Sequence, residues 1–217
     1  MIYRKAAVAA VSGIILATGV ISCDGDNPVI PTPQDYCHYL PLQIGNKWVF
    51  DVKVDTRYEP PSQYELAYEV TAVKRNYKDV AQSYVITVTK DGKPHTEITA
   101  AYDDDAVYLD RAIWSYLIAD GMTKGGWTQT GLVDTSPLIY SRDEDVEVPA
   151  GSFAGCRVLS FENGSEYNPA TWEEFYARGT GLVYYKYTAK EYESSPPYSL
   201  LDWRVVEYRL KSFTVKT

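Results

Sequence analysis

Histidine is scarce in this sequence, and the short motifs that mark most catalytic and metal sites are missing. Only His38 and His95 occur in 217 residues. Neither belongs to an H-E-x-x-H pattern or a Cys/His cluster, which excludes the usual zinc sites. No G-x-S-x-G nucleophile elbow is present, and Gly125-Gly126 and Gly179-x-Gly181 lack the rest of a phosphate-binding loop. The sequence therefore predicts no metal, no cofactor and no enzyme of a recognised class.

Basic residues are too few to suit a nucleic acid. The chain has 21 Lys and Arg against 29 Asp and Glu; without Arg4 and Lys5 of the leader described below, 19 remain and the net charge is −10. Such a surface repels nucleic acid and anionic lipid headgroups. The acidic clusters Asp103-Asp104-Asp105 and Asp143-Glu144-Asp145 do not match a calcium loop with alternating ligands and a required glycine. We interpret both as solvated turns.

Long amphipathic helical patterns are absent too, and the period of two that is typical of strands dominates instead. Trp48, Phe50 and Val52 alternate with charged residues, for example. The same kind of pattern predicts further strands at 64–71, 84–88, 96–102, 106–109, 155–161, 171–177, 182–188 and 201–213. The segment 110–119 suits either one short helix or a buried strand.

Strands that follow one another through short turns pair as an antiparallel meander. We therefore predict an all-β domain that forms a barrel, a half-barrel or a sandwich, with at most one short helix. The strand faces that carry no core residues are rich in Lys, Glu and Asp, which would be costly against lipid tails. We expect the strands to form a soluble domain and not a membrane barrel.

The long apolar run of the chain stands at its N-terminus. Arg4 and Lys5 precede the apolar segment Ala6–Val20, which has the layout of an export signal. Val20-Ile21-Ser22-Cys23 closes it and resembles the lipobox of bacterial lipoproteins. The resemblance implies that Cys23 becomes the acylated N-terminus after cleavage, and two or more acyl chains anchor a protein stably. An ordinary secretory signal that contains a cysteine is the alternative.

The domain organisation follows from this leader. Residues 1–22 form the predicted signal peptide. Residues 23–35 contain three prolines and no periodic apolar pattern, which indicates a lipid-anchored, flexible tether. Residues 36–217 form the single β-rich domain. We expect a cell-envelope location, with the membrane as partner through the N-terminal lipid; inner membrane, outer membrane and cell surface all stay open.

Cys37 and Cys156 are the two cysteines beyond the lipidation site. An even pair in an oxidising compartment usually forms a disulfide. This bridge would close a loop of about 120 residues, which is worth about 4–5 kcal/mol in the chain-entropy model. Two unpaired buried thiols are the alternative.

Three motifs resemble those of a broad group of secreted bacterial β-proteins. They are Pro41 to Trp48, Val148 to Cys156, and Gly179-Thr180-Gly181-Leu182-Val183. The resemblance implies a fold and an exported location but no activity. On physical grounds, the first motif is a turn that delivers Trp48 to the core, and the glycines of the third allow a bend before a strand.

Aromatic residues are abundant, with 20 tyrosines and five tryptophans. Most must pack within the sheet, but a ring on an outward face can stack on a sugar or fill a protein interface. The candidate ligand-contact residues are Trp114, Trp127, Trp172, Tyr184 and Tyr185.

These observations predict a non-catalytic cell-envelope lipoprotein whose β-domain binds an apolar ligand, such as a lipid, or a partner protein. A closed apolar cavity would favour the apolar ligand. The alternatives are a surface glycan-binding module, which a row of exposed aromatic rings would favour, and an envelope enzyme with an unrecognised site, which a buried carboxylate pair would favour.

Overall fold

The computed structural model describes residues 37–216 except residue 79 and residues 111–113. Every regular element in this part of the chain is a strand, which confirms the all-β prediction. The strands are β1 (Lys47–Thr56), β2 (Ser62–Tyr77), β3 (Val80–Lys90), β4 (Lys93–Asp103), β5 (Ala106–Asp110), β6 (Trp114–Ala119), β7 (Ile139–Val148), β8 (Gly151–Asn163), β9 (Ala170–Ala177), β10 (Gly181–Tyr192) and β11 (Leu200–Thr214). Within the described residues, no helix exists that could cross a membrane.

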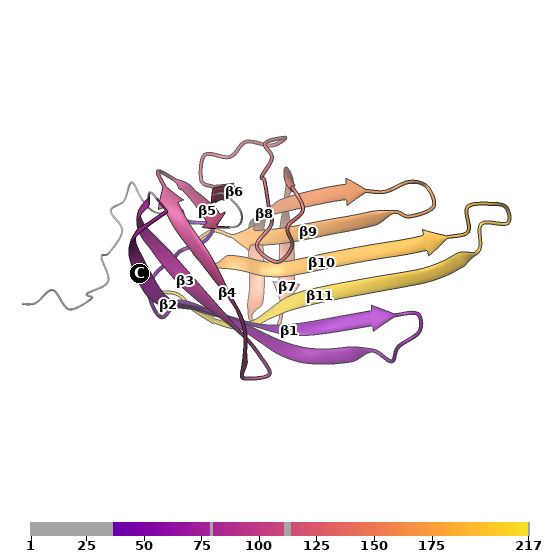
Figure 1. Cartoon of the computed structure of the whole chain (residues 1–217), viewed down its shortest axis with the longest axis horizontal. Helices are drawn as coiled ribbons and strands as arrows, with labels where there is room; N and C mark the ends of the chain where they lie inside the picture. The colour runs from indigo at the N-terminus through magenta and orange to yellow at the C-terminus, as the bar shows by residue number, and fades with distance from the viewer. Residues whose placement is uncertain (1–36, 79, 111–113, 217) are drawn as a thin grey trace, which may run out of the picture.

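All eleven strands belong to one antiparallel sheet, in the order β6-β5-β4-β3-β2-β1-β11-β10-β9-β8-β7. Strands that are adjacent in sequence are paired in the sheet, and the first and last strands pair at its centre. Lys47 lies opposite Thr214 and Thr56 opposite Arg204 along this seam. The β1–β2, β8–β9 and β10–β11 loops gather at one end of the molecule, and the described chain begins and ends at the other (Figure 1).

The alternation in the sequence decides which face of each strand is buried. In β1, Trp48, Phe50 and Val52 are at most 3% exposed, whereas Asp51 and Lys53 are solvent-exposed. Side chains at i and i+2 of a strand share a face, so the apolar set of each strand adds to one continuous core. Its largest fully buried side chains are Tyr176, Phe50, Leu40, Leu42, Ile86, Leu109, Leu117, Ile118, Leu138, Leu159, Leu182 and Leu210.

Two local expectations are resolved by the structure. Of the two readings of 110–119, the strand is correct, because β6 pairs with β5 from Trp114 onward. The interpretation of Asp143-Glu144-Asp145 as a turn was wrong. These residues lie inside β7, where Glu144 pairs with Arg142 at 2.6 Å and the Asp143 carboxylate accepts a hydrogen bond from Tyr140. Partners on the same strand thus stabilise acidic residues that a sequence pattern assigns to a turn.

The connection between β6 and β7, residues 120–138, lies against both edge strands of the sheet. The amide of Gln129 donates to the carbonyl oxygen of Tyr116 in β6 at 3.0 Å, and the amide of Tyr140 in β7 donates to Gly126 at 2.8 Å. Leu132 and Leu138 from the same connection are buried in the core. The connection therefore occupies backbone groups of β6 at Tyr116 and of β7 at Tyr140, which limits pairing of these positions with other chains.

Cys37 and Cys156 are both buried and free, so the predicted disulfide is not formed in the structure. The Cys37 thiol lies 3.8 Å from the carbonyl oxygen of Ile118, whereas the Cys156 thiol lies 3.6 Å from that of Phe153. Each thiol thus has its own backbone acceptor, as the alternative reading of two buried thiols expected.

Candidate functional site

The five aromatic residues selected from the sequence do not form one site. Trp127 is 61% exposed, whereas Tyr185 is 4% exposed and packs on Tyr208 in the core. Tyr184 lies on the opposite face, where its hydroxyl donates to Glu207 at 3.2 Å. Trp172 is half-buried. Trp114 begins β6, and its side chain lies outside the described part of the structure.

Trp172 belongs to a row of aromatic rings that crosses three strands. Its ring centroid is 5.5 Å from that of Phe161 on β8 and 5.1 Å from that of Tyr187 on β10. The register places these three residues directly opposite one another. All three are half-buried and pack against the core. Their planes differ by 36° and 38°, so the row offers a partly open aromatic surface near the loop end of the sheet.

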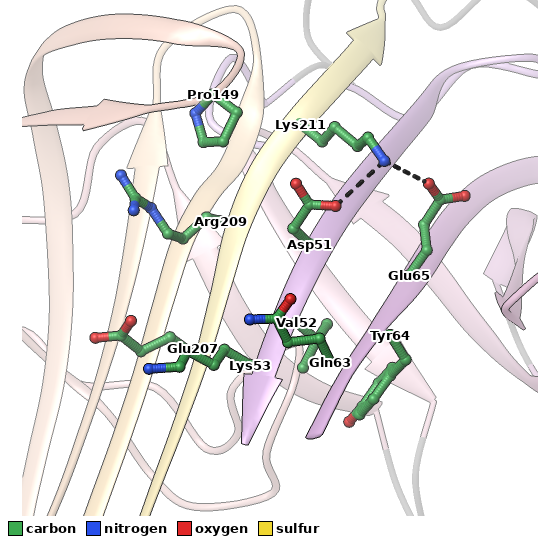
Figure 2. A pocket seen from close by; sticks show the side chains of 10 residues that line it. All are labelled: Asp51, Val52, Lys53, Gln63, Tyr64, Glu65, Pro149, Glu207, Arg209 and Lys211. Carbon is green, nitrogen blue, oxygen red and sulfur yellow. Dashed lines mark hydrogen bonds and ion pairs between the residues drawn. The ribbon is translucent and has the colours of Figure 1, made fainter. Parts of the chain in front are cut away.

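A polar cavity of about 610 Å³ lies over the outer face of β2, β1 and β11 (Figure 2). It is lined by Asp51, Val52, Lys53, Gln63, Tyr64, Glu65, Pro149, Glu207, Arg209 and Lys211. The ammonium group of Lys211 lies 3.3 Å from Asp51 and 3.1 Å from Glu65, as the dashed lines in Figure 2 show. Pro149, from the β7–β8 turn, borders one side.

The charges of this cavity are balanced within the sheet. Glu207 accepts a hydrogen bond from Tyr184 and lies 4.0 Å from Lys186, and Lys53 pairs with Asp55 at 2.7 Å. Ion pairs on a solvated sheet face contribute little stability each. The arrangement explains how a charged outer face is tolerated, and it singles out no ligand.

A fully buried carboxylate, Glu174, lies on the inner face of β9. It accepts hydrogen bonds from the amides of Leu132 and Val133 at 3.1 and 3.0 Å and from the hydroxyl of Tyr176 at 2.5 Å. Burial raises the pKa of Glu174, against the opposing effect of these three donors. These contacts hold the Glu174 carboxylate between β9 and the β6–β7 connection.

Cys37, His38 and Asp120 come together at the start of the domain. The Cys37 thiol lies 3.7 Å from the Asp120 carboxylate, which also accepts a hydrogen bond from the His38 amide at 2.9 Å and contacts the His38 ring. Burial, followed by the nearby Asp120 charge, raises the pKa of Cys37 to about 12. Because the thiolate is the nucleophilic form, a protonated Cys37 in this position is suited to packing and not to catalysis.

Three loops at the end of the molecule far from Cys37 form one surface, which we call the distal loop surface. It comprises loops 57–61, 164–169 and 193–199 together with the strand ends beside them, Tyr192, Leu200 and Leu201. Its exposed fractions are 72% for Tyr58, 47% for Tyr198, 36% for Leu200 and 38% for Leu201. Large contiguous apolar patches on a protein surface are a feature of binding sites.

Hydrogen bonds and ring contacts join the three loops. The Tyr58 hydroxyl donates to the carbonyl oxygen of Leu201 at 2.5 Å, and the Arg57 guanidinium donates to that of Leu200. The amide of Tyr192 donates to the carbonyl oxygen of Tyr167 at 2.7 Å. The exposed rings are therefore held in place by backbone contacts.

A cavity of about 280 Å³ opens within this surface. It is lined by Glu166, Tyr167, Tyr192 and Tyr198. The rings of Tyr167 and Tyr198 lie 5.6 Å apart with an interplanar angle of 31°. A hydrogen bond to the Glu166 carboxylate raises the pKa of the Tyr167 hydroxyl. The cavity thus combines aromatic faces with one carboxylate.

Tyr198 has a backbone φ of 55°. The other non-glycine residues with positive φ in the described structure are Asn76, Lys78, Asp91 and Asp104. A bulky aromatic residue in the left-handed region is a genuine outlier, and strain of this kind clusters at binding sites. In this conformation the Tyr198 ring packs against that of Tyr167.

Sequence reasoning missed Tyr58, Tyr167, Tyr192 and Tyr198. Each lies in or beside a turn, where no alternation shows which way a ring points. A usable signal was the combination of aromatic residues with proline in Tyr58-Glu59-Pro60-Pro61 and Pro196-Pro197-Tyr198. Among the described residues, no group of three or more His, Cys, Asp or Glu side chains could hold a metal ion.

No protein-family model matches the chain, and no curated protein resembles it significantly. Two similar solved structures are known. One is described as an exported protein with a YmcC-like fold from Bacteroides fragilis NCTC 9343; it shares 14% identity and a TM-score of 0.48, over 82% of this chain and 99% of that chain. The other is described as a lipoprotein from Parabacteroides distasonis ATCC 8503. It is 15% identical, with a TM-score of 0.47, and the match covers 83% of this chain and 100% of that chain.

Proposed function

We propose that this protein is a non-catalytic lipoprotein of the cell envelope that binds a partner protein through its distal loop surface. The observation that carries the proposal is the set of exposed aromatic and aliphatic side chains on three loops that are joined to one another. Tyrosine is enriched in protein interfaces because it combines a large apolar ring with a hydrogen-bonding hydroxyl. The distal loop surface offers such rings already ordered.

The orientation of the domain supports the same proposal. The described chain begins at Cys37, at the end opposite the distal loop surface (Figure 1). If Cys23 carries the lipid and residues 23–35 form the tether, the distal loop surface lies at the end of the domain opposite the point of attachment. Anchoring is tested by intact-mass analysis of the native protein. We expect an acylated chain that begins at Cys23, and a chain that retains Met1 would contradict it.

A partner protein fits better than an apolar ligand held inside the domain. The inner face is occupied by large buried side chains such as Tyr176 and Phe50. The two cavities described above lie on the outside, and the larger one is polar. Catalysis has no support from Glu174 or Cys37, because the first is held by three donors and the second has a raised pKa.

Site-specific photocrosslinking in cells that natively produce the protein tests the proposal. A photoreactive phenylalanine analogue replaces Tyr58, and a control replaces Lys93, which is exposed in the β3–β4 hairpin. We expect position 58 to give a discrete crosslinked partner that position 93 does not give. Equal crosslinking at both positions, or none at position 58, would contradict partner binding by this surface.

Glycan binding is a second candidate, and the row Phe161–Trp172–Tyr187 favours it. Aromatic faces of this kind stack on sugar rings. On a glycan array, binding that is lost in Trp172→Ala but kept in Tyr198→Ala would support this alternative. The absence of any bound glycan would remove it.

A further inference from the structure

The cavity of the distal loop surface has an unusual composition for its size. Three of its four lining residues are tyrosines, and the fourth is Glu166. The face of an aromatic ring carries partial negative charge and attracts cations within about 6 Å of its centroid. A carboxylate beside such faces adds a full negative charge. Neither feature helps to hold an anion.

The loops around this cavity are acidic as well. The sequence ranges 57–61, 164–169 and 191–202 contain Arg57 as their one basic residue. Their acidic residues are Glu59, Glu166, Glu191, Glu193 and Asp202. Arg57 already donates to the carbonyl oxygen of Leu200 and lies over the ring of Tyr58 at 5.5 Å. These ranges carry five acidic residues against one basic residue, a net charge of −4, with Lys190 and Arg204 just outside them, and a net negative surface attracts cations.

We propose that Glu166, Tyr167, Tyr192 and Tyr198 form an aromatic cage that binds an organic ammonium group. This inference deepens the proposed function, on which it rests, by naming the chemistry that the distal loop surface recognises. The ammonium lies against the ring faces, and the Glu166 carboxylate balances its charge. The source of the ammonium is either a lysine side chain of the partner protein or a small quaternary amine.

Tyrosine rings alone would also accept a neutral apolar group, so the charge of the ligand is the property to test. Two pairs of probes differ in charge but hardly in shape. Choline is compared with 3,3-dimethyl-1-butanol, in which carbon replaces the nitrogen. The peptide acetyl-Gly-Lys-Gly-amide is compared with the same peptide carrying norleucine.

Binding is followed by NMR of the domain with labelled tyrosine rings. We expect at least one cation to shift these signals with an affinity about tenfold or more above that of its neutral counterpart. Preference for choline identifies a small amine, and preference for the lysine peptide identifies a protein side chain. Equal affinities within both pairs, or no response to either cation, would overturn the proposal.

Two charge-matched variants locate the effect. Glu166→Gln removes the carboxylate of the cage, whereas Glu59→Gln removes the same charge from an exposed position on loop 57–61. We expect the first to abolish most of the preference for the cation and the second to change it less than twofold. Similar losses in both variants would show a diffuse acidic field in place of a cage. Circular dichroism checks that both variants are folded.

The outcome is separable from that of the crosslinking experiment. Crosslinks at position 58 without ammonium binding would keep the proposed function and remove the cage. Ammonium binding without crosslinks would keep the cage and remove the partner protein.

Discussion

The indole Nε1 of Trp48 donates a hydrogen bond to the carbonyl oxygen of Thr180 at 2.5 Å. The contact joins β1 to the β9–β10 turn, 132 positions away along the chain. Gly181 follows Thr180, and its Cα lies so close to the indole that an added Cβ would stand 2.9 Å from Nε1. Two of the motifs that resemble those of secreted β-proteins, Pro41 to Trp48 and Gly179 to Val183, thus meet in the structure. The indole of Trp48 leaves no room for a side chain at position 181.

This relationship predicts the effect of an added methyl group at position 181. Gly181 has a φ of 106°, and Gly179 has a φ of 75° with no atom within 4 Å of an added Cβ. Gly181→Ala combines backbone strain with a clash, and we expect it to lower the free energy of unfolding by about 2–4 kcal/mol. Gly179→Ala introduces backbone strain alone, and we expect it to lower the free energy of unfolding by about 1–2 kcal/mol. Urea denaturation measures both, and equal losses would show that the Trp48 contact does not matter.

The buried Glu174 predicts a pH dependence of stability. Its pKa in the folded protein is raised above the ordinary value of 4.5, so the folded state binds the proton more tightly than the unfolded state. The favourable contribution of Glu174 to the free energy of unfolding is therefore complete below about pH 4.5. It is lost as the pH rises through the pKa that Glu174 has in the folded protein. Glu174→Gln cannot ionise, and we expect its free energy of unfolding relative to the wild type to increase as the pH rises from 4.5 to 8.

Denaturation midpoints at several pH values test this expectation. Glu162→Gln, which changes an exposed carboxylate on β8, is the control and should follow the wild type. Parallel pH profiles for Glu174→Gln and the wild type would show that the carboxyl group does not titrate differently on folding.

The two free cysteines predict a slow reaction with thiol reagents. Burial raises the pKa of Cys37 to about 12 and that of Cys156 to about 11. At pH 8, roughly one Cys37 thiol in ten thousand is then ionised. A chain that begins at residue 24 should release little thionitrobenzoate from Ellman's reagent while folded. After unfolding without reductant it should titrate as two thiols, and a count of zero would establish a disulfide.

The strained backbone at Tyr198 predicts a conflict between stability and binding. Glycine adopts a positive φ without the penalty that tyrosine incurs, although it loses more chain entropy on folding. We expect Tyr198→Gly to leave the free energy of unfolding unchanged or to raise it by up to about 1 kcal/mol, while it abolishes binding at the cage. Thermal unfolding together with the NMR titration measures both. A loss of stability above about 1 kcal/mol would indicate that the ring is held for packing.

Local sequence patterns were sufficient for most of the fold. The alternation around Trp48 and Phe50 predicts the buried face of β1, and Asp91-Gly92 lies at the β3–β4 hairpin with φ values of 49° and 73°. These features depend on neighbours in the chain, because side-chain direction in a strand repeats every two residues. β7 was missed because its run of acidic residues is typical of a turn, whereas in the strand Tyr140 and Arg142 pair with Asp143 and Glu144.

The candidate site depends instead on the tertiary structure. Tyr58, Tyr167 and Tyr198 are more than 30 positions apart in the chain, and only the pairing of β1 with β11 and the order of β8 to β11 bring their loops to one end. Position 23 and the tether, by contrast, are predicted from the sequence alone and lie outside the described residues. The sequence by itself therefore determined most of the strands and predicted the anchor. The order of strands in the sheet decided which rings share a surface, because contacts between distant residues are set by strand order and not by local periodicity.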